Sequence, residues 1–367
     1  MWRTAALEIA ASFSAVAALI YLLDPFARKI GLLDWPGGRK DHSVPTPVTG
    51  GLAIAFGTIT PALLLTPPNP QVVGLGIAAV ILIVVGVLDD LKDIRWYWRI
   101  LAQVAAALCI IFIGDVKVEQ IGPVFGLGRL ALGDLSVPFT VLATVGLINA
   151  LNMADGLDGL AGSMAICALA MLAAAAAYAG NDDLTHGLLM LVGAVAAFLM
   201  FNLRLPWRRR ARVFLGNSGS AYLGLIIAWA AFRLTQNPSH PVSPVLAPFL
   251  VAPPVIDCLV LMARRVMHRK SPFKADRTHI HHLLLDGGFS VTAVVLGLSM
   301  ASLLLGLGAA MAMRADVPHP LFLVTYLAMT AAYFAFSADP DRATAVIARL
   351  TRGGAAAAKP GSSEQPL

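Results

Sequence analysis

Four amide and carboxylate side chains recur every three residues at the end of a long apolar run. They are Asn149, Asn152, Asp155 and Asp158, within the segment NALNMADGLDGLAG. Residues three apart on a helix are neighbours on one face, so this spacing predicts a polar stripe of two amides and two carboxylates. Two carboxylates at the boundary between lipid and protein are costly unless a cation or a substrate compensates them. Capping residues are the plainer interpretation, but acidic residues at a helix C-terminus oppose the helix dipole.

A second pair of acids, Asp89 and Asp90, ends another apolar run in the segment VLDDLKD. Adjacent helical residues diverge by about 100°, so one carboxylate can face a site while the other turns to a neighbour. Carboxylate and amide oxygens are hard ligands that suit Mg²⁺, which usually keeps some water and bridges to substrate phosphates. The two acidic segments favour a magnesium site that handles phosphates, with a solvated helix end as the alternative for this second pair.

Three further polar clusters carry basic, glycine-rich or histidine-rich sequence. Residues 37–51 form a basic loop with glycine and proline, and residues 216–220 open an apolar run with backbone N–H groups that suit an anion. Residues 264–285 hold several Arg and Lys together with a cluster of three histidines at 279, 281 and 282, whose spacing and lack of a nearby Cys make a zinc site a weak interpretation. Signals of membrane orientation are the alternative for the basic loops. All the clusters together indicate an anionic, metal-bound substrate at a membrane face.

The composition indicates that these polar groups belong to a membrane protein. The chain has 367 residues, is 58% hydrophobic and only 13% charged, and has a mean hydropathy of +0.76. A soluble domain would be about 25% charged. Apolar stretches of roughly 20 residues can cross a hydrocarbon core. We therefore expect an all-α polytopic protein with about eleven spans, near residues 4–23, 49–67, 71–88, 97–114, 138–152, 160–179, 187–201, 219–236, 244–263, 290–313 and 320–337.

The basic residues are distributed unequally between alternate connections. Of the 27 Lys and Arg residues, 22 fall in the set of connections that includes residues 24–48, 202–218 and 264–289. The positive-inside rule then predicts a periplasmic N-terminus and a cytoplasmic C-terminus. The charge of +6 is thus an asymmetry of topology, and nucleic-acid binding is not expected because no recognised motif accompanies it.

The remaining organisation is simple. We expect a single integral-membrane domain over residues 1–337 and a disordered cytoplasmic tail over residues 338–367, which is rich in Ala, Gly and Ser. The outer connection at residues 114–138 has a pattern compatible with a small β-hairpin. The three cysteines lie in apolar runs, where free Cys behaves as a small hydrophobe, so a disulfide framework is not expected.

Five motifs in this order resemble a known family. The motifs are GGRKDHSVPTPVTGG, LDDLKD, NALNMADGLDGL, FLGNSGS and SPFKADRTHIHHLL. They resemble the polyprenyl-phosphate N-acetylhexosamine-1-phosphate transferases of glycosyltransferase family 4. The HIHH form favours the bacterial branch that uses UDP-GlcNAc and undecaprenyl phosphate and initiates O-antigen or other surface polysaccharides. The resemblance covers roughly residues 24–289 and the layout of eleven spans.

The resemblance implies transfer of GlcNAc-1-phosphate from UDP-GlcNAc to undecaprenyl phosphate at the cytoplasmic face of the bacterial inner membrane, with release of UMP. It implies Mg²⁺, or Mn²⁺ in its place. It implies catalytic roles for Asp89, Asp90, Asp155 and Asp158, and metal contacts from Asp89, Asp90, Asp155 and Asn217. The substrate-binding residues that it implies are Asn149, Asn152, Lys40, His42, Arg265, Ser271, Arg277, His279, His281 and His282.

One residue departs from the family's pattern. The family normally has an aspartate that binds the metal at the position of Asn217, and an amide there withdraws one negative charge. We therefore expect an active enzyme with an altered metal demand, with an inactive relative as the alternative.

Several alternatives stay open at the level of sequence. For the mechanism, Asp89 is expected to deprotonate the lipid phosphate in a single displacement, with a phospho-aspartyl intermediate as the rival. A transporter would place ionisable residues near the midplane in paired halves, whereas these acids cluster at one rim and no repeat is visible. A membrane scaffold would not need the acidic stripe. Another UDP-N-acetylhexosamine is the alternative donor, and a homodimer stays open.

Overall fold

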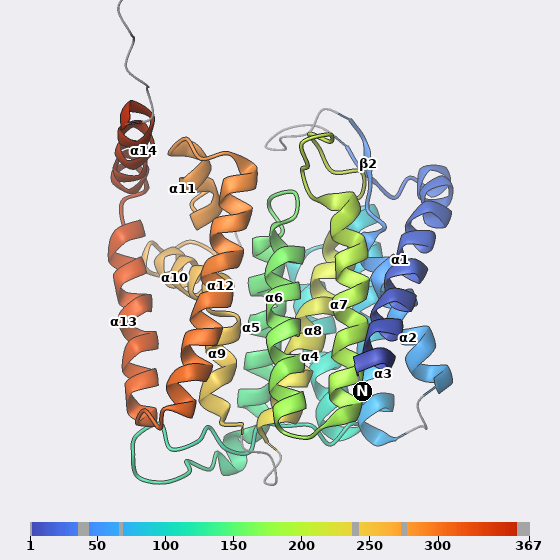
Figure 1. The fold of residues 1–367 in the computed structure, drawn as a ribbon, viewed down its shortest axis with the longest axis horizontal. Helices are drawn as coiled ribbons and strands as arrows, with labels where there is room; N and C mark the ends of the chain where they lie inside the picture. The colour runs from blue at the N-terminus through green and yellow to red at the C-terminus, as the bar shows by residue number, and fades with distance from the viewer. Residues whose placement is uncertain (1, 36–43, 66–68, 237–241, 273–276, 358–367) are drawn as a thin grey trace, which may run out of the picture.

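The computed structural model describes residues 2–35, 44–65, 69–236, 242–272 and 277–357, which form a bundle of roughly aligned helices (Figure 1). Among these residues, seven helices are long and apolar enough to cross a membrane. The chain is thus a polytopic membrane protein. The seven are α1 (Trp2–Ile30), α3 (Pro70–Lys92), α5 (Ser136–Ala154), α6 (Leu160–Tyr178), α7 (Asp182–Asn202), α12 (Val291–Arg314) and α13 (His319–Ser337).

The other expected spans also coincide with helices. They are α2 (Gly50–Leu65), α4 (Trp96–Phe112) and α8 (Gly216–Thr235), and a bent segment made of η2 (Pro244–Leu246), α9 (Ala247–Leu250) and α10 (Ala252–Met267). If the bent segment counts as one span, the described residues hold eight candidate spans. The number of eleven and the orientation of the N-terminus stay predictions.

The bent segment changes direction by 81° between α9 and α10. The break falls at Val251, whose φ of −128° and ψ of 22° are not helical. Pro253 and Pro254 follow, and neither has an N–H group to continue a helix across the break. As a result α10 runs across the bundle rather than along it (Figure 1).

Close helix crossings bring the acidic end of α3 to the start of α8. A Cβ atom on Gly51 of α2 would lie 2.2 Å from the Cα of Gly219, and one on Gly86 of α3 would lie 2.4 Å from the Cα of Ser218. Only glycine permits such contacts between backbones. Because α2 and α3 approach α8 this closely, the residues that follow Gly86 by one turn reach the N-terminus of α8.

Short elements gather at one end of the bundle, the upper end in Figure 1. Strands β1 (Leu33–Asp34) and β2 (Thr46–Pro47) pair antiparallel, and the Phe214 N–H donates to the Pro47 carbonyl over 2.9 Å. The helices α11 (Ile280–Asp286) and α14 (Pro340–Ala357) lie at the same end. The connections expected on the cytoplasmic side therefore share one end.

The expectation of a disordered tail is wrong for residues 340–357, which form α14. Ala343 and Ile347 of this helix are buried against Leu283 of α11, and the Thr351 hydroxyl donates to the Gly287 carbonyl over 2.9 Å. An apolar stripe at helical spacing thus finds a partner that composition alone did not reveal. Residues 358–367 lie outside the described residues.

The expected outer hairpin is reduced to a single antiparallel β-bridge between Gln120 and Ala131. The side chain of Gln236, just past α8, holds this connection by accepting from the N–H groups of Glu119 and Gln120 over 2.9 and 3.1 Å. The short helix η1 (Gly133–Leu135) then leads into α5.

Candidate active site

A cleft of about 970 Å³ opens at the end of the bundle that holds β1, β2 and α11. It collects side chains from the end of α3, the turn between α5 and α6, the α7–α8 connection and α11. The predicted site residues that line the cleft are Asp89, Asp90, Asn152, Asp155, Asp158, Asn217 and His282. Segments far apart in the sequence therefore converge as the motifs predicted.

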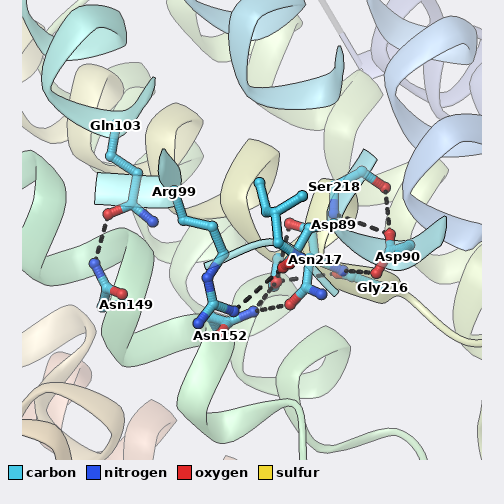
Figure 2. Close-up of polar contacts among 11 residues, drawn as sticks. Asp89, Asp90, Arg99, Gln103, Asn149, Asn152, Gly216, Asn217 and Ser218 are labelled. Carbon is cyan, nitrogen blue, oxygen red and sulfur yellow. Dashed lines mark hydrogen bonds and ion pairs between the residues drawn. The ribbon is translucent and has the colours of Figure 1, made fainter. Parts of the chain in front are cut away.

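Asp89 is buried, and it is held by its own helix end and by α4. Its Oδ1 accepts from the Ile94 N–H over 3.0 Å, and its Oδ2 pairs with Arg99 Nη1 over 3.2 Å (Figure 2). The guanidinium offsets the charge of a carboxylate that would otherwise be costly to bury. Each oxygen keeps a lone pair for a further proton or cation.

Asp90 turns to α8, as the divergence of adjacent helical residues allows. Its Oδ1 accepts from the Asn217 N–H over 3.0 Å, and its Oδ2 lies 3.4 Å from both the N–H and the hydroxyl of Ser218 (Figure 2). The N–H groups at this helix start were expected to suit a bound anion, and that anion is the protein's own carboxylate. Asp90 therefore fixes where α8 begins.

A glycine makes this contact sterically feasible. Gly216 has a φ of +78°, in the left-handed region, and a Cβ atom there would lie 2.4 Å from Val48 Cγ1 and 2.8 Å from Asp90 Oδ2. A larger residue would push the start of α8 away from α3. Gly216 of the FLGNSGS motif thus leaves the space that Asp90 of the LDDLKD motif occupies.

Four amide side chains connect α5 with α4 and α8. Asn152 Nδ2 donates to Asn217 Oδ1 over 2.8 Å and to Ser220 Oγ over 2.9 Å. Asn149 instead donates to Gln103 Oε1 of α4 over 2.6 Å (Figure 2). It lies in a smaller hollow beside the cleft, which it shares with Arg99.

Three of the four members of the predicted stripe lie together, although not on one helix. Asn152, Asp155 and Asp158 line the cleft, whereas Asn149 lies one turn deeper between helices. Helix α5 ends at Ala154, and Asp155 after it adopts non-helical angles of φ −78° and ψ 40°. A turn rather than a continued helix carries the last two acids.

Asp155 is the acid without internal compensation. Within the described residues, no group donates a hydrogen bond to its carboxylate and no cationic side chain pairs with it. Burial, followed by the negative charges of Asp90 and Asp158, raises the pKa of Asp155 well above its usual range. The folded protein therefore penalises the ionised form, and a cation in the cleft would relieve that penalty.

Asp158 has a dedicated partner in the α7–α8 connection. Arg204 Nε lies 2.7 Å from its Oδ2, and the Ala211 N–H donates to the same oxygen over 3.3 Å. The turn is held further by buried Asn202, whose Oδ1 accepts from the Gly159 N–H over 2.7 Å. This turn is therefore a fixed feature of the cleft.

The three histidines occupy different depths. His282 lines the cleft, and His281 is buried behind it, packed so closely on Gly156 that a Cβ atom there would lie 2.6 Å from His281 Nε2. Burial, with the neighbouring His282 and His279, lowers the pKa of His281 to about 3, so this ring is neutral. His279 is buried further back, against α10, and does not line the cleft.

The remaining predicted residues lie at the margin. Arg277 is exposed and pairs with Asp286 over 3.9 Å. Arg265 is buried, with its Nη1 donating to the Pro272 carbonyl over 2.7 Å, and Ser271 is exposed. Neither these three residues nor His279 and His281 are among the residues lining the cleft. Lys40 and His42 lie outside the described residues.

Sequence reasoning missed three partners of the site. Arg99 and Arg204 pair with Asp89 and Asp158, and Asp257 of α10 pairs with His279. The first two were counted only as positive-inside charges. Asp257 did carry a signal, because it is a single acid within the apolar run PPVIDCLVLM.

The cleft fits a hard divalent cation that binds together with a phosphate-bearing substrate. Within the described residues, no three His, Cys, Asp or Glu side chains converge as a complete metal site. The cleft nevertheless offers a set of oxygen donors with negative charge. The set consists of the carboxylates of Asp155, Asp89 and Asp90 and the amide oxygen of Asn217. Mg²⁺ is commonly held by one or two carboxylates together with water and substrate phosphates, so the donor set suits it.

Comparison with known proteins identifies the family. The profile of Glycosyl transferase family 4 matches residues 72–235. The undecaprenyl-phosphate alpha-N-acetylglucosaminyl 1-phosphate transferase of Salmonella typhi is 33% identical over 325 residues, which cover 88% of each chain. The proteins of the same name from Escherichia coli K12 and Haemophilus influenzae are each 31% identical, over 88% and 77% of this chain and 88% and 80% of their own.

The chain therefore belongs to glycosyl transferase family 4. It is a membrane-embedded phosphotransferase, as the five motifs predicted.

Proposed function

We propose that this protein transfers GlcNAc-1-phosphate from UDP-GlcNAc to undecaprenyl phosphate, releasing UMP and forming undecaprenyl-diphosphate-GlcNAc. The observation that carries the proposal is the Asp155 carboxylate, which has no partner among the described residues, in a cleft that it shares with Asp89, Asp90 and Asp158. The relatives named above, which are similar over most of both chains, support the same substrates.

The reaction brings two anions together, so catalysis must come mainly from charge compensation and alignment. The sides of the cleft suit this task because the turn at Asp155 and Asp158 is fixed by Arg204 and Asn202, while Asp90 fixes the start of α8. Asp155 with Asp89, Asp90 and the Asn217 oxygen would hold Mg²⁺, or Mn²⁺ in its place. When bound, the metal would neutralise charge on the reacting phosphates.

Asp89 is the proposed base for the lipid phosphate. A phosphate monoester has a second pKa near 6, so its final proton is easily removed near neutral pH. In the described structure both oxygens of Asp89 accept hydrogen bonds, and the lone pair left on each could take that proton. A phospho-aspartyl intermediate is the rival, and trapping of phosphate on the protein during turnover would favour it.

The orientation proposed from the charge distribution puts the cleft at the cytoplasmic face of a bacterial inner membrane. UDP-sugars would then reach the cleft from water, and the lipid would arrive from the bilayer. Initiation of O-antigen or another surface polysaccharide is the proposed role.

The test uses the purified full-length protein in detergent with Mg²⁺, undecaprenyl phosphate and radiolabelled UDP-GlcNAc. We expect one labelled lipid and equimolar UMP, with Asp155→Asn as the inactive control. UDP-GalNAc in a parallel reaction tests the choice of hexosamine. Labelled lipid from UDP-GalNAc alone would contradict the donor, and no lipid from either sugar would contradict the proposed reaction.

A further inference from the structure

A buried acid on α10 binds the segment that begins the histidine cluster. Asp257 Oδ2 lies 2.7 Å from His279 Nδ1, and its Oδ1 accepts from the Ile280 N–H over 3.0 Å and from the Tyr333 hydroxyl of α13. Asp257 and His279 are both buried. Three groups from two other segments thus converge on one carboxylate inside a membrane protein.

This convergence has an energetic reason. A carboxylate buried between apolar helices is costly unless hydrogen bonds or a charge compensate it. Among the described residues, the hydrogen bonds that compensate Asp257 come from the start of α11 and from Tyr333. The same contacts that make the acid tolerable therefore hold the start of α11 on α10 and α13.

The contacts continue from this anchor to the cleft. The His279 and His281 rings are stacked, with centroids 5.4 Å apart and planes 14° apart, and the His281 and His282 rings are 4.3 Å apart. His281 rests on Gly156, next to Asp155, and His282 lines the cleft. A shift of His279 would therefore displace the His281 ring and, through it, the His282 ring.

We infer that Asp257 and Tyr333 are positioning residues for the active site, and that they act through His279. The carboxylate accepts a hydrogen bond from Nδ1, so it fixes the proton on that nitrogen and the plane of the ring. The stacked rings then set where His282 stands in the cleft. The inference rests on the proposed function, because it assigns the histidine side of the cleft to the transfer reaction.

Asp257→Asn and Tyr333→Phe are the informative substitutions. An asparagine oxygen can still accept from Ile280, but its NH₂ group cannot accept the Nδ1 proton. We expect kcat to fall about 10- to 100-fold in Asp257→Asn, the rate equivalent of losing a hydrogen bond to a charged group. Tyr333→Phe should lose less, and the KM for undecaprenyl phosphate should stay unchanged in both.

The chain offers a matched control on α13. Tyr326 lies two turns before Tyr333, and its buried hydroxyl has no hydrogen-bond partner among the described residues. Tyr326→Phe should therefore leave kcat unchanged. If it lowers kcat as much as Tyr333→Phe does, the effect belongs to general packing of α13 and the inference is wrong.

A double-mutant comparison tests whether Asp257 acts through His279. In a His279→Ala background, Asp257→Asn should cause no further loss of kcat, because the partner is already absent. Additive losses would overturn the inference. Normal expression and thermal unfolding within a few degrees of the wild type are required of each variant compared.

A spectroscopic measurement decides the question if the wild-type protein proves inactive. In ¹⁵N-histidine-labelled protein, the Nδ1 resonance of His279 is identified by its loss in His279→Ala. We expect a protonated Nδ1 in the wild type, a changed signal in Asp257→Asn, and no change in Tyr326→Phe. An Nδ1 signal unaltered in Asp257→Asn would refute the positioning role, whereas inactivity of the wild type alone would refute only the proposed reaction.

Discussion

Replacement of Asn217 by aspartate should lower the Mg²⁺ concentration needed for activity. Asn217 stands at the start of α8, where its backbone N–H binds Asp90 and its Oδ1 accepts from Asn152 over 2.8 Å. An aspartate has the same shape and can still accept that hydrogen bond. The substitution therefore adds one negative charge to the cleft and keeps the contact with Asn152, although it removes the hydrogen bond that the Asn217 side chain gives to Asp90.

The magnitude follows from charge and desolvation. A unit charge about 4 Å from another gains about 4 kcal/mol at an effective dielectric of 20, and a divalent ion doubles this before other costs. Desolvation of the carboxylate and repulsion from Asp90, Asp155 and Asp158 remove much of the gain. We expect a net rise in Mg²⁺ affinity of about 10- to 100-fold, the scale of single changes around metal ligands.

The assay is a Mg²⁺ titration of lipid-product formation by wild-type and Asn217→Asp protein in the same detergent. The half-maximal Mg²⁺ concentration should move to lower values. Asn181→Asp is the matched control, because it makes the same change at the N-cap of α7, at the opposite end of that helix from the cleft. An unshifted titration of a folded Asn217→Asp protein would show that this side chain does not contact the metal.

Three further outcomes are expected. Asp155→Asn should lower turnover by about 100-fold or more. Because the pKa of Asp155 is raised in the folded state, this acid contributes stability to the metal-free fold below the ordinary carboxyl range. That contribution is lost as the pH rises through the raised pKa. The melting temperature should therefore fall over that range in the wild type and fall less in Asp155→Asn. Asp90→Asn should reduce both turnover and stability, the latter by about 1 kcal/mol, as for other lost helix caps. Gly156→Ala should displace His281 and cost about 1–3 kcal/mol in the thermal melt, whereas Gly146→Ala, with open space around it, should not. Equal melting curves for the two alanine variants would contradict the close packing.

Hydropathy predicted the helices well because lipid exposure demands long apolar runs. Each expected span has a helix or the bent pair at its position, and the ordered polar motifs at the span ends converge on one cleft. Periodicity failed at the end of α5. A stripe from Asn149 to Asp158 would need a helix that continues past Ala154, and α5 stops there. Composition failed for α14, whose few apolar residues suffice once α11 is beside them.

Most of the missed features depend on contacts between segments that are distant in the sequence. The pairing of Asp90 with α8 joins residues 127 positions apart, and that of Tyr333 with Asp257 joins residues 76 apart. Sequence pattern reports which side chains are polar, and the packing of helices decides which of them meet. Even so, a lone acid such as Asp257 inside an apolar run is a usable signal, because its burial always requires a partner.

Compensation of charge separates the roles of the four cleft acids. Asp89 is paired with Arg99, Asp90 with the start of α8, and Asp158 with Arg204, so each of these three also holds a structural element in place. The Asp155 carboxylate makes no hydrogen bond or ion pair among the described residues, and its ionised form is penalised. Its neutralisation should therefore abolish metal-dependent activity without loosening the fold, while loss of any other acid should weaken both. The acid that the structure leaves uncompensated is the one most directly available to the substrate and its cation.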